Sequence, residues 1–265
     1  MELILIIKAA VLGVVEGLTE FLPVSSTGHL IVVGELLDFN DEKGKVFEMI
    51  IQLGAILGVV WDYRGRVGRL IMGLNRRHEQ LFALNLFIAF LPAAVVGLLF
   101  HNQIKQYLFG ATTVGVALIV GGILILVIER LPLRARIDSI ENLGPMDPLK
   151  TGIAQIFSLL PGVSRAGATI MGGLLTGLTR TTATEFSFFL AMPIMFAVFF
   201  FELIINRALL QVADMPIFAV GFVTSFVTAL VVVRVFLKYV SGHNFTVFAW
   251  YRIVFGALVL AWFWK

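Results

Sequence analysis

Two short stretches of this chain hold most of the residues that could do chemistry, and both lie inside apolar sequence. Residues 16–29 read EGLTEFLPVSSTGH, and residues 158–169 read SLLPGVSRAGAT. Ionisable groups are costly at membrane depth and usually face a cavity with a function. Two carboxylates, a histidine, several hydroxyls and an arginine together indicate a site for a metal ion and a phosphate.

The first candidates are two glutamates. Glu16 and Glu20 are four residues apart in a segment that we expect to be helical, so their side chains share one face. Two ionised carboxylates would repel each other there, unless one is protonated or a cation lies between them. Because the chain has no cysteine, oxygen ligation by Glu16 and Glu20 favours Mg²⁺ or Ca²⁺. The alternative is a pair of glutamates where the helix meets water.

A run of hydroxyls follows the glutamates. Ser25, Ser26, Thr27 and Gly28 come after Pro23 and before an apolar helix. Such residues cap helices, and we expect capping here. The same geometry directs backbone N–H groups and hydroxyls at an anion. We therefore predict that Ser25, Thr27 and Gly28 bind phosphate and that Ser26 can attack phosphorus if a base takes its proton.

His29 is the third kind of candidate. It lies three residues after Ser26, about one helical turn away. At that spacing it could act as the base for Ser26 or as the nucleophile itself. The alternative is a hydrogen-bonded histidine with a structural role.

Arg165 dominates the second stretch. It lies between Gly162 and Gly167, and its planar fork of donors matches phosphate oxygens and stabilises charge in phosphoryl transfer. A salt bridge to one of the glutamates is the alternative, and both can hold. Gly162, Ser164 and Thr169 are expected to bind the substrate phosphate as well, although the two hydroxyls could equally cap a helix.

Composition indicates a multi-pass membrane protein. Of 265 residues, 59% are hydrophobic and 14% charged, and the mean hydropathy is +0.96; soluble domains carry about 25% charged residues. The net charge of +3 is small, lies mainly in loops, and gives no indication of nucleic-acid binding. Six apolar runs predict membrane-crossing helices: residues 47–61, 82–100, 111–128, 186–205, 216–237 and 245–264.

Two further apolar segments are broken in the middle. Residues 2–37 are interrupted at Pro23, and residues 149–178 at Pro161. The pieces after each break are too short to span a bilayer. They favour re-entrant helix–loop–helix hairpins, because irregular backbone survives at depth only where it is buried in protein or lines a wet cavity.

Internal symmetry and loop charge indicate an inverted repeat. Arginine-rich residues 62–78 and the basic residues 130–150 are expected on the cytoplasmic side, whereas 101–110 carry only two basic or histidine side chains. Each broken segment is followed by three crossings, so the second half enters with opposite orientation. We predict one all-α membrane domain with repeats at about 1–130 and 147–265, six crossings, two re-entrant hairpins and a midplane site.

The two stretches resemble a known family. The Glu-x-x-x-Glu pattern with Pro-Val-Ser-Ser-Thr-Gly-His, and the later Pro-Gly-Val-Ser-Arg, are similar to motifs of the bacterial undecaprenyl-diphosphate phosphatase family, which is associated with bacitracin resistance. The resemblance covers nearly the whole chain. One departure is Ala166, where the family usually has serine, which argues against a direct role for that hydroxyl.

The resemblance implies an enzyme that hydrolyses undecaprenyl diphosphate to the monophosphate, recycling a lipid carrier for cell-wall synthesis. It implies a divalent cation, a polyprenyl diphosphate substrate drawn from the membrane lipids, a homodimer, and a site on the outer face of the bacterial plasma membrane. By motif, Glu16 and Glu20 match the acidic residues, Ser26 and His29 the nucleophile region, and Arg165 the phosphate-binding arginine. Ser26, His29 and metal-bound water all stay open as nucleophile.

A transporter or flippase of a lipid phosphate or an ion is the rival interpretation. Inverted repeats with broken helices are also typical of transporters, and fold does not fix function.

Four other charged residues lie in apolar sequence. Glu48 and Glu185 are expected behind the site. Arg234 and Arg252 are expected either to reach a membrane interface or to pair with other groups inside the protein.

Overall fold

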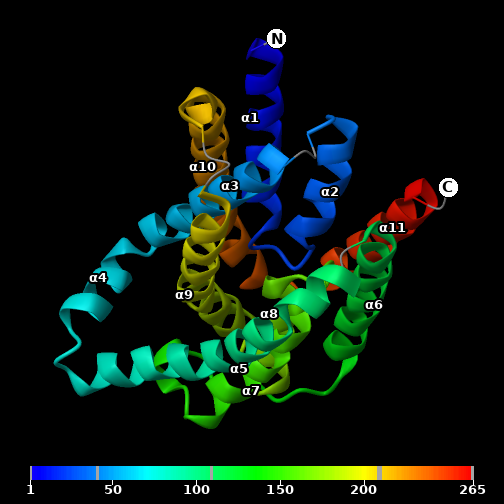
Figure 1. Ribbon diagram of the computed structural model, residues 1–265. Coiled ribbons are helices and arrows are strands. Elements are labelled where there is room, and N and C mark those ends of the chain that lie inside the picture. Colours follow the sequence, from blue (N-terminus) through cyan, green and yellow to red (C-terminus); the bar gives the residue numbers. More distant parts are fainter. Residues whose placement is uncertain (1, 40–41, 108–109, 208–210, 264–265) are drawn as a thin grey trace.

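The computed structural model describes residues 2–39, 42–107, 110–207 and 211–263. Within these residues the regular structure is helical, with a single isolated β-bridge between Ile137 and Leu178. Figure 1 shows the arrangement. The α-helices are α1 (Glu2–Thr19), α2 (Ser26–Leu36), α3 (Glu42–Asp62), α4 (Arg64–Met72), α5 (Arg77–Tyr107), α6 (Ala111–Arg130), α7 (Met146–Ile156), α8 (Arg165–Leu175), α9 (Arg180–Asn206), α10 (Met215–Val240) and α11 (Thr246–Phe263).

The long helices confirm an all-α integral membrane protein. Helices α5, α6, α9, α10 and α11 are long and apolar enough to cross a membrane, and α3 with α4 makes a sixth candidate bent by 79°. The prediction of a loop at 101–110 was wrong for most of its length. Helix α5 continues from the apolar segment into polar sequence and ends at Tyr107. Trp264, at the end of the last apolar run, lies outside the described residues.

Both expected breaks are present. Helix α1 ends at Thr19 and α2 begins at Ser26, with residues 20–25 between them, which we call the first loop. Helix α7 is followed by a 3₁₀ turn, Phe157–Leu159, and residues 160–164 form the second loop before α8. The residue before each following helix has a left-handed backbone: φ is 71° at Ser25 and 74° at Ser164. Such a conformation costs free energy in residues other than glycine and is often found at functional sites.

The helices pack in reciprocal pairs. Helix α1 packs on α10 and α7 on α5, while α6 packs on α11 and α3 on both α9 and α10. In the predicted inverted repeat α1 corresponds to α7 and α10 to α5, so the pair of α1 and α10 corresponds to the pair of α7 and α5. This agrees with the repeat, which remains a prediction together with the re-entrant course of the two hairpins.

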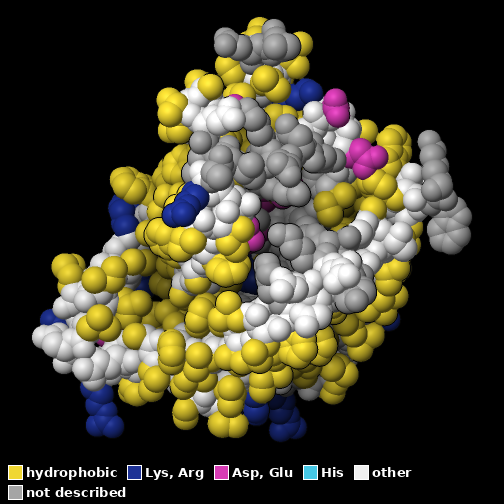
Figure 2. Space-filling model, in the orientation of Figure 1, with side chains coloured by type: hydrophobic (Ala, Val, Ile, Leu, Met, Phe, Trp, Pro, Cys, Tyr) yellow, Lys and Arg dark blue, Asp and Glu magenta, His cyan; other side chains and the backbone are white. Residues whose placement is uncertain are grey.

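The surface suits a lipid environment. On the face shown in Figure 2, hydrophobic side chains cover most of the surface, and Lys and Arg side chains lie along the lower edge, near α5 and α7. The interior is aromatic: Phe186, Phe188 and Phe189 of α9 are fully buried. Helix α9, with these buried rings, packs against α8.

Close contact between α6 and α11 depends on small residues. A Cβ atom added at Gly256 would lie 2.8 Å from the carbonyl oxygen of Gly115, and one at Gly122 would lie 2.6 Å from that of Ala249. Small residues let transmembrane backbones approach each other in this way. Both helices also hold the two loops, so their separation affects the site.

We predict that Gly256→Ala destabilises the protein. The new methyl group would meet backbone atoms, which cannot rotate away, and overpacking of this kind costs about 1–3 kcal/mol. Thermal melting in detergent should therefore occur at a lower temperature. Gly242→Ala is the matched control, because no atom lies within 4 Å of its added Cβ. Equal melting temperatures for the two variants would contradict the close packing of α6 and α11.

Candidate active site

The first and second loops meet inside the molecule. The Ser164 hydroxyl donates a hydrogen bond to the Leu22 carbonyl across 3.4 Å. The second loop and the first turn of α2 also rest on α6: Cβ atoms added at Gly162 and Gly28 would contact the backbone and the side chain of Val114 respectively. The N-terminal ends of α2 and α8, from opposite halves of the sequence, are therefore brought together.

A chain of three polar side chains joins the two halves. The Ser26 hydroxyl donates to Glu20 Oε2, and Arg165 Nη2 donates to Glu20 Oε1 across 3.0 Å. The side chains of Arg165 and Glu20 are 12% and 11% exposed, so the ion pair is screened little by solvent. The arginine–glutamate salt bridge expected from sequence is thus formed, while the group beside the Ser26 hydroxyl is Glu20 and not His29, the base expected from sequence.

Contacts from α9 orient the arginine. Arg165 Nη1 donates to the Ser187 carbonyl across 3.1 Å, and the guanidinium lies 5.5 Å from the centre of the Phe21 ring. The Thr169 hydroxyl, one turn along α8, donates to the Arg165 carbonyl and shares a 2.6 Å hydrogen bond with the Ser187 hydroxyl. Sequence reasoning gave Ser187 no role. Its only signal in the sequence was that residues 184–187, TEFS, are among those that resemble the family.

Glu16 is fully buried. It is 0% exposed, and neither carboxylate oxygen has a hydrogen-bond partner among the described residues. Its charged neighbours are Glu20, Glu48 and Arg165. Two unpartnered oxygens in a buried site are what a cation ligand would offer. The described residues contain no group of three or more His, Cys, Asp or Glu side chains that could hold a metal, so protein ligands alone would not complete the coordination.

His29 lies beside Ser26 in sequence but bonds elsewhere. Its Nδ1 lies 2.7 Å from the Ser25 carbonyl, which only accepts, so Nδ1 carries the proton. Nε2 is then the acceptor for the Tyr251 hydroxyl, 2.6 Å away. The ring also stacks on Phe255, with centroids 4.3 Å apart. Nothing in the local sequence pointed to Tyr251, because it is 222 residues away along the chain.

The remaining predicted phosphate-binding residues fall into two groups. Ser164 caps α8, since its hydroxyl accepts from the Gly167 amide. Ser25 occupies the corresponding position before α2 and has nearly the same backbone torsion, but its side chain forms no cap, which corrects our expectation of capping there. Thr27 is half-buried and Gly28 is buried at the start of the same helix. This end of α2 therefore keeps amides without a capping side chain.

The other intramembrane charges have separate partners. Glu48 is near Glu16, as expected. Glu185, which was expected behind the site, instead has Glu141 and Arg66 as its charged neighbours, although it lies only two residues before Ser187 in α9. A hydrogen bond from the Ser139 hydroxyl holds the pKa of Glu141 below its usual value, so that cluster keeps an ionised carboxylate at neutral pH.

The two arginines that were expected to pair or reach an interface do so differently. Arg234 is exposed and pairs with Asp62 across 2.6 Å. Arg252 is 1% exposed and donates to five backbone carbonyls. Internal pairing is therefore confirmed for Arg252, whose acceptors are all carbonyls, whereas Arg234 pairs at the surface.

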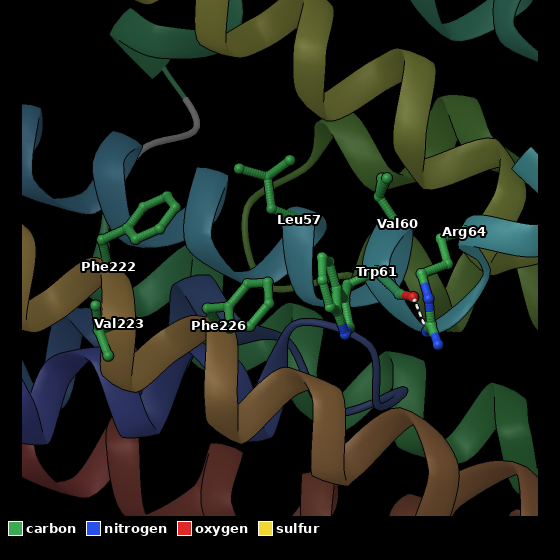
Figure 3. Close-up of a pocket in the computed structure, with 7 residues that line it drawn as sticks. All are labelled: Leu57, Val60, Trp61, Arg64, Phe222, Val223 and Phe226. Carbon is green, nitrogen blue, oxygen red and sulfur yellow. Dashed lines mark hydrogen bonds between the residues drawn. The ribbon is translucent and has the colours of Figure 1, made fainter. Parts of the chain in front are cut away.

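A separate apolar groove lies between α3 and α10. It encloses about 410 Å³ and is lined by Leu57, Val60, Trp61, Arg64, Phe222, Val223 and Phe226. Figure 3 shows the aromatic rings along it, with Arg64 at one end donating to the Trp61 carbonyl. Its lining holds no carboxylate, hydroxyl or histidine.

Comparisons with known proteins identify the family of this chain. The family model described as "Bacitracin resistance protein BacA" matches residues 9–258. The chain is similar to three proteins named undecaprenyl-diphosphatase. It is 53% identical to the one from Methylobacillus flagellatus over 269 residues, covering 100% of both chains. It is 56% identical to that of Nitrosospira multiformis, covering 98% of this chain and 96% of the relative. It is 54% identical to that of Dechloromonas aromatica with the same coverage. This chain therefore belongs to the bacitracin resistance protein BacA family.

Proposed function

We propose that the protein is an undecaprenyl-diphosphatase that releases inorganic phosphate from a C55 prenyl diphosphate and leaves the lipid monophosphate. The observation that carries this proposal is the chain Ser26–Glu20–Arg165, which joins a hydroxyl, a base and a phosphate-binding cation across the two loops. Relatives that are 53–56% identical over nearly the whole chain carry the same name. The apolar helices provide the surface on which such a lipid lies.

Ser26 is the nucleophile that fits this geometry. Ionised Glu20 accepts the Ser26 proton while Oγ forms a bond to the terminal phosphorus. The bond from that phosphorus to the bridging oxygen breaks, and the lipid monophosphate leaves with the proton from Glu20. Water then attacks the phosphoserine with Glu20 as base again. Inorganic phosphate departs, and Oγ regains its proton.

Arg165 stabilises the negative charge on the transferred phosphoryl group. Its guanidinium is held by the Ser187 carbonyl and by Glu20, so it is oriented before the substrate arrives. Thr169 supports this orientation through the Arg165 carbonyl. Amides at the starts of α2 and α8 supply further donors, which suits an anion at a helix N-terminus.

His29 is placed to support the site through the backbone. Its hydrogen bonds to the Ser25 carbonyl and Tyr251 hydroxyl tie the first turn of α2 to α11. With Nε2 occupied by Tyr251, attack by His29 on phosphorus would need a different ring position. We therefore assign His29 to holding Ser26 in place, and we retain it as the alternative nucleophile that the test below addresses.

Glu16 and Glu20 fit a divalent cation. Glu16 offers two buried oxygens without partners, and Mg²⁺ commonly binds one or two carboxylates together with substrate phosphate and water. A cation bound there would lower the cost of negative charge on the phosphate oxygens.

The orientation and assembly follow from the same proposal. A bacterial plasma membrane, two inverted repeats at about 1–130 and 147–265, and a first loop open to the outer face would let the substrate diphosphate enter from outside. Basic residues at 62–78 and 130–150 support a cytoplasmic location for those segments. A homodimer, as in the family resemblance, remains part of the proposal.

We predict that purified protein in detergent releases phosphate from undecaprenyl diphosphate and that Arg165→Ala lowers the rate constant about 10²–10³-fold, because a preorganised donor to the developing charge is lost. Phosphate release is the measurement, with melting temperature as a check of folding. Arg234→Ala is the control, since its exposed pair with Asp62 is at the protein surface. No release from folded wild-type protein with any cation would favour the lipid-phosphate transporter instead.

We predict that Ser26→Ala lowers turnover by at least about a hundredfold, whereas His29→Gln, which retains a hydrogen-bonding side chain, has a smaller effect. Acid quenching of a single turnover with labelled substrate should leave acid-stable phosphoserine on the protein. An acid-labile phosphoprotein that forms normally in Ser26→Ala would identify His29 as the nucleophile. Turnover without any phosphoprotein would identify water.

We predict that Glu16→Gln raises the cation concentration needed for half-maximal activity by about tenfold or more, because one ionised ligand is lost. EDTA should stop phosphate release by wild-type protein, and added Mg²⁺ or Ca²⁺ should restore it. Glu202→Gln, at a glutamate bonded to Asn206 near the end of α9, is the control. An unchanged cation requirement in Glu16→Gln would remove Glu16 from the metal site.

A further inference from the structure

Arg252 of α11 reaches into the junction of the two loops. It is 1% exposed, and it donates to the Pro23 carbonyl of the first loop across 3.1 Å. It also donates to Gly162 and Val163 of the second loop across 3.0 and 2.8 Å. One guanidinium group therefore binds the backbone of both loops.

The same guanidinium is anchored to α6. Nε donates to the Leu118 carbonyl across 3.3 Å and Nη2 to the Ala117 carbonyl across 3.2 Å. With these, all five hydrogen bonds of the side chain go to carbonyls. An arginine has five N–H donors in a rigid fork, so the side chain is fully used. A lysine, with three donors on one atom, could not bind the same set.

Glycines form the socket for this side chain. A Cβ atom added at Gly121 would lie 2.2 Å from Arg252 Nη2, and one added at Gly167 would lie 3.2 Å from Nη1. Gly162, whose carbonyl is one of the acceptors, has a left-handed φ of 92°. Any side chain at position 121 would have to push the guanidinium out of its place.

The bonds to the second loop bear directly on Arg165. The Val163 carbonyl, which accepts from Arg252, and the Ser164 amide form one peptide unit. In a trans peptide the carbonyl and the amide are fixed in one plane and point in opposite directions. Fixing the Val163 carbonyl therefore fixes the orientation of Ser164, the residue with positive φ that comes directly before Arg165 at the start of α8. On the other side, the Pro23 carbonyl lies between Glu20 and Ser26 in the first loop.

The charge of Arg252 has no acidic partner in the described part of the chain; its acceptors there are carbonyl dipoles. Burying a cation in this way costs free energy that a neutral residue would avoid. The hydrogen bonds of this one guanidinium connect α6 with both loops. The positive charge of Arg252 lies against the two loops, which bind a diphosphate in the proposed function.

We infer that Arg252 is a positioning residue of the active site: by clamping the Pro23, Gly162 and Val163 carbonyls, it sets the first loop, with Ser26 and Glu20, in register with Arg165 of α8. This inference rests on the proposed function. Misplacing reacting groups by about 1 Å can lower a rate by about a hundredfold, so the clamp should affect turnover more than stability.

Two single variants and their combination test the inference. Arg252→Lys keeps the charge and loses most of the hydrogen bonds. Gly121→Ala keeps Arg252 but displaces its guanidinium, and alanine favours a helix more than glycine does. The controls are Arg234→Lys and Gly65→Ala; an added Cβ at Gly65 has no atom within 4 Å. The measurements are kcat and KM for undecaprenyl diphosphate with cation present, and melting temperature in the same detergent.

We expect kcat per folded molecule to fall about tenfold in Gly121→Ala and about tenfold to a hundredfold in Arg252→Lys, with both controls unchanged. The Gly121→Ala protein should stay folded and lose less melting temperature than Arg252→Lys, because its arginine is still present and alanine favours the helix. The double variant should be no slower than Arg252→Lys alone, because the two changes act through one side chain.

Other outcomes would overturn the inference. If Gly121→Ala folds and keeps wild-type kcat and KM, the position of the guanidinium does not matter for turnover, even if Arg252→Lys fails to fold. Additive losses in the double variant, or a lower melting temperature with normal kcat per folded molecule, would show a structural role alone. If wild-type protein releases no phosphate, the proposed function fails first, and the role assigned to Arg252 fails with it.

Discussion

The structure depends on satisfying the backbone at two helix breaks inside a membrane protein. In an apolar environment a carbonyl without a donor costs several kcal/mol, and the breaks at Pro23 and Pro161 leave several carbonyls outside the helical pattern. Arg252 provides the donors, from a third helix, for both breaks at once. A charged side chain thus stabilises irregular backbone that water cannot reach, and the two loops are held together as a consequence.

The chemistry follows from that junction. Once the loops meet, Glu20 from one half of the chain lies between Ser26 of its own half and Arg165 of the other. One carboxylate can then act as a base on one side and as an anchor for the arginine on the other. The opposite case is Glu16, whose oxygens have no protein partner. In a well-packed interior, unpaired oxygens of this kind are most simply explained by a ligand that binds there.

Support for the site extends outward through contacts between distant segments. Ser187 of α9 holds the guanidinium of Arg165, and Tyr251 of α11 holds His29. Helices α6 and α11 approach closely at Gly115 and Gly256, which brings the socket of Arg252 against both loops. The rigid outer helices thus fix short and strained segments, as expected where reacting groups must be held within a fraction of an ångström.

The sequence by itself determined the helical class, the apolar helices long enough to cross a membrane, and the positions of both breaks with the candidate residues at them, because hydropathy, proline and clustered polar residues are local signals. Only the tertiary structure decided which groups meet. His29 is adjacent to Ser26 in sequence, yet it bonds to Tyr251; Ser25 does not cap its helix; and Arg252 turned out to bind both loops. These hydrogen bonds of His29 and Arg252 join residues 89 to 229 positions apart, and no local pattern encodes them.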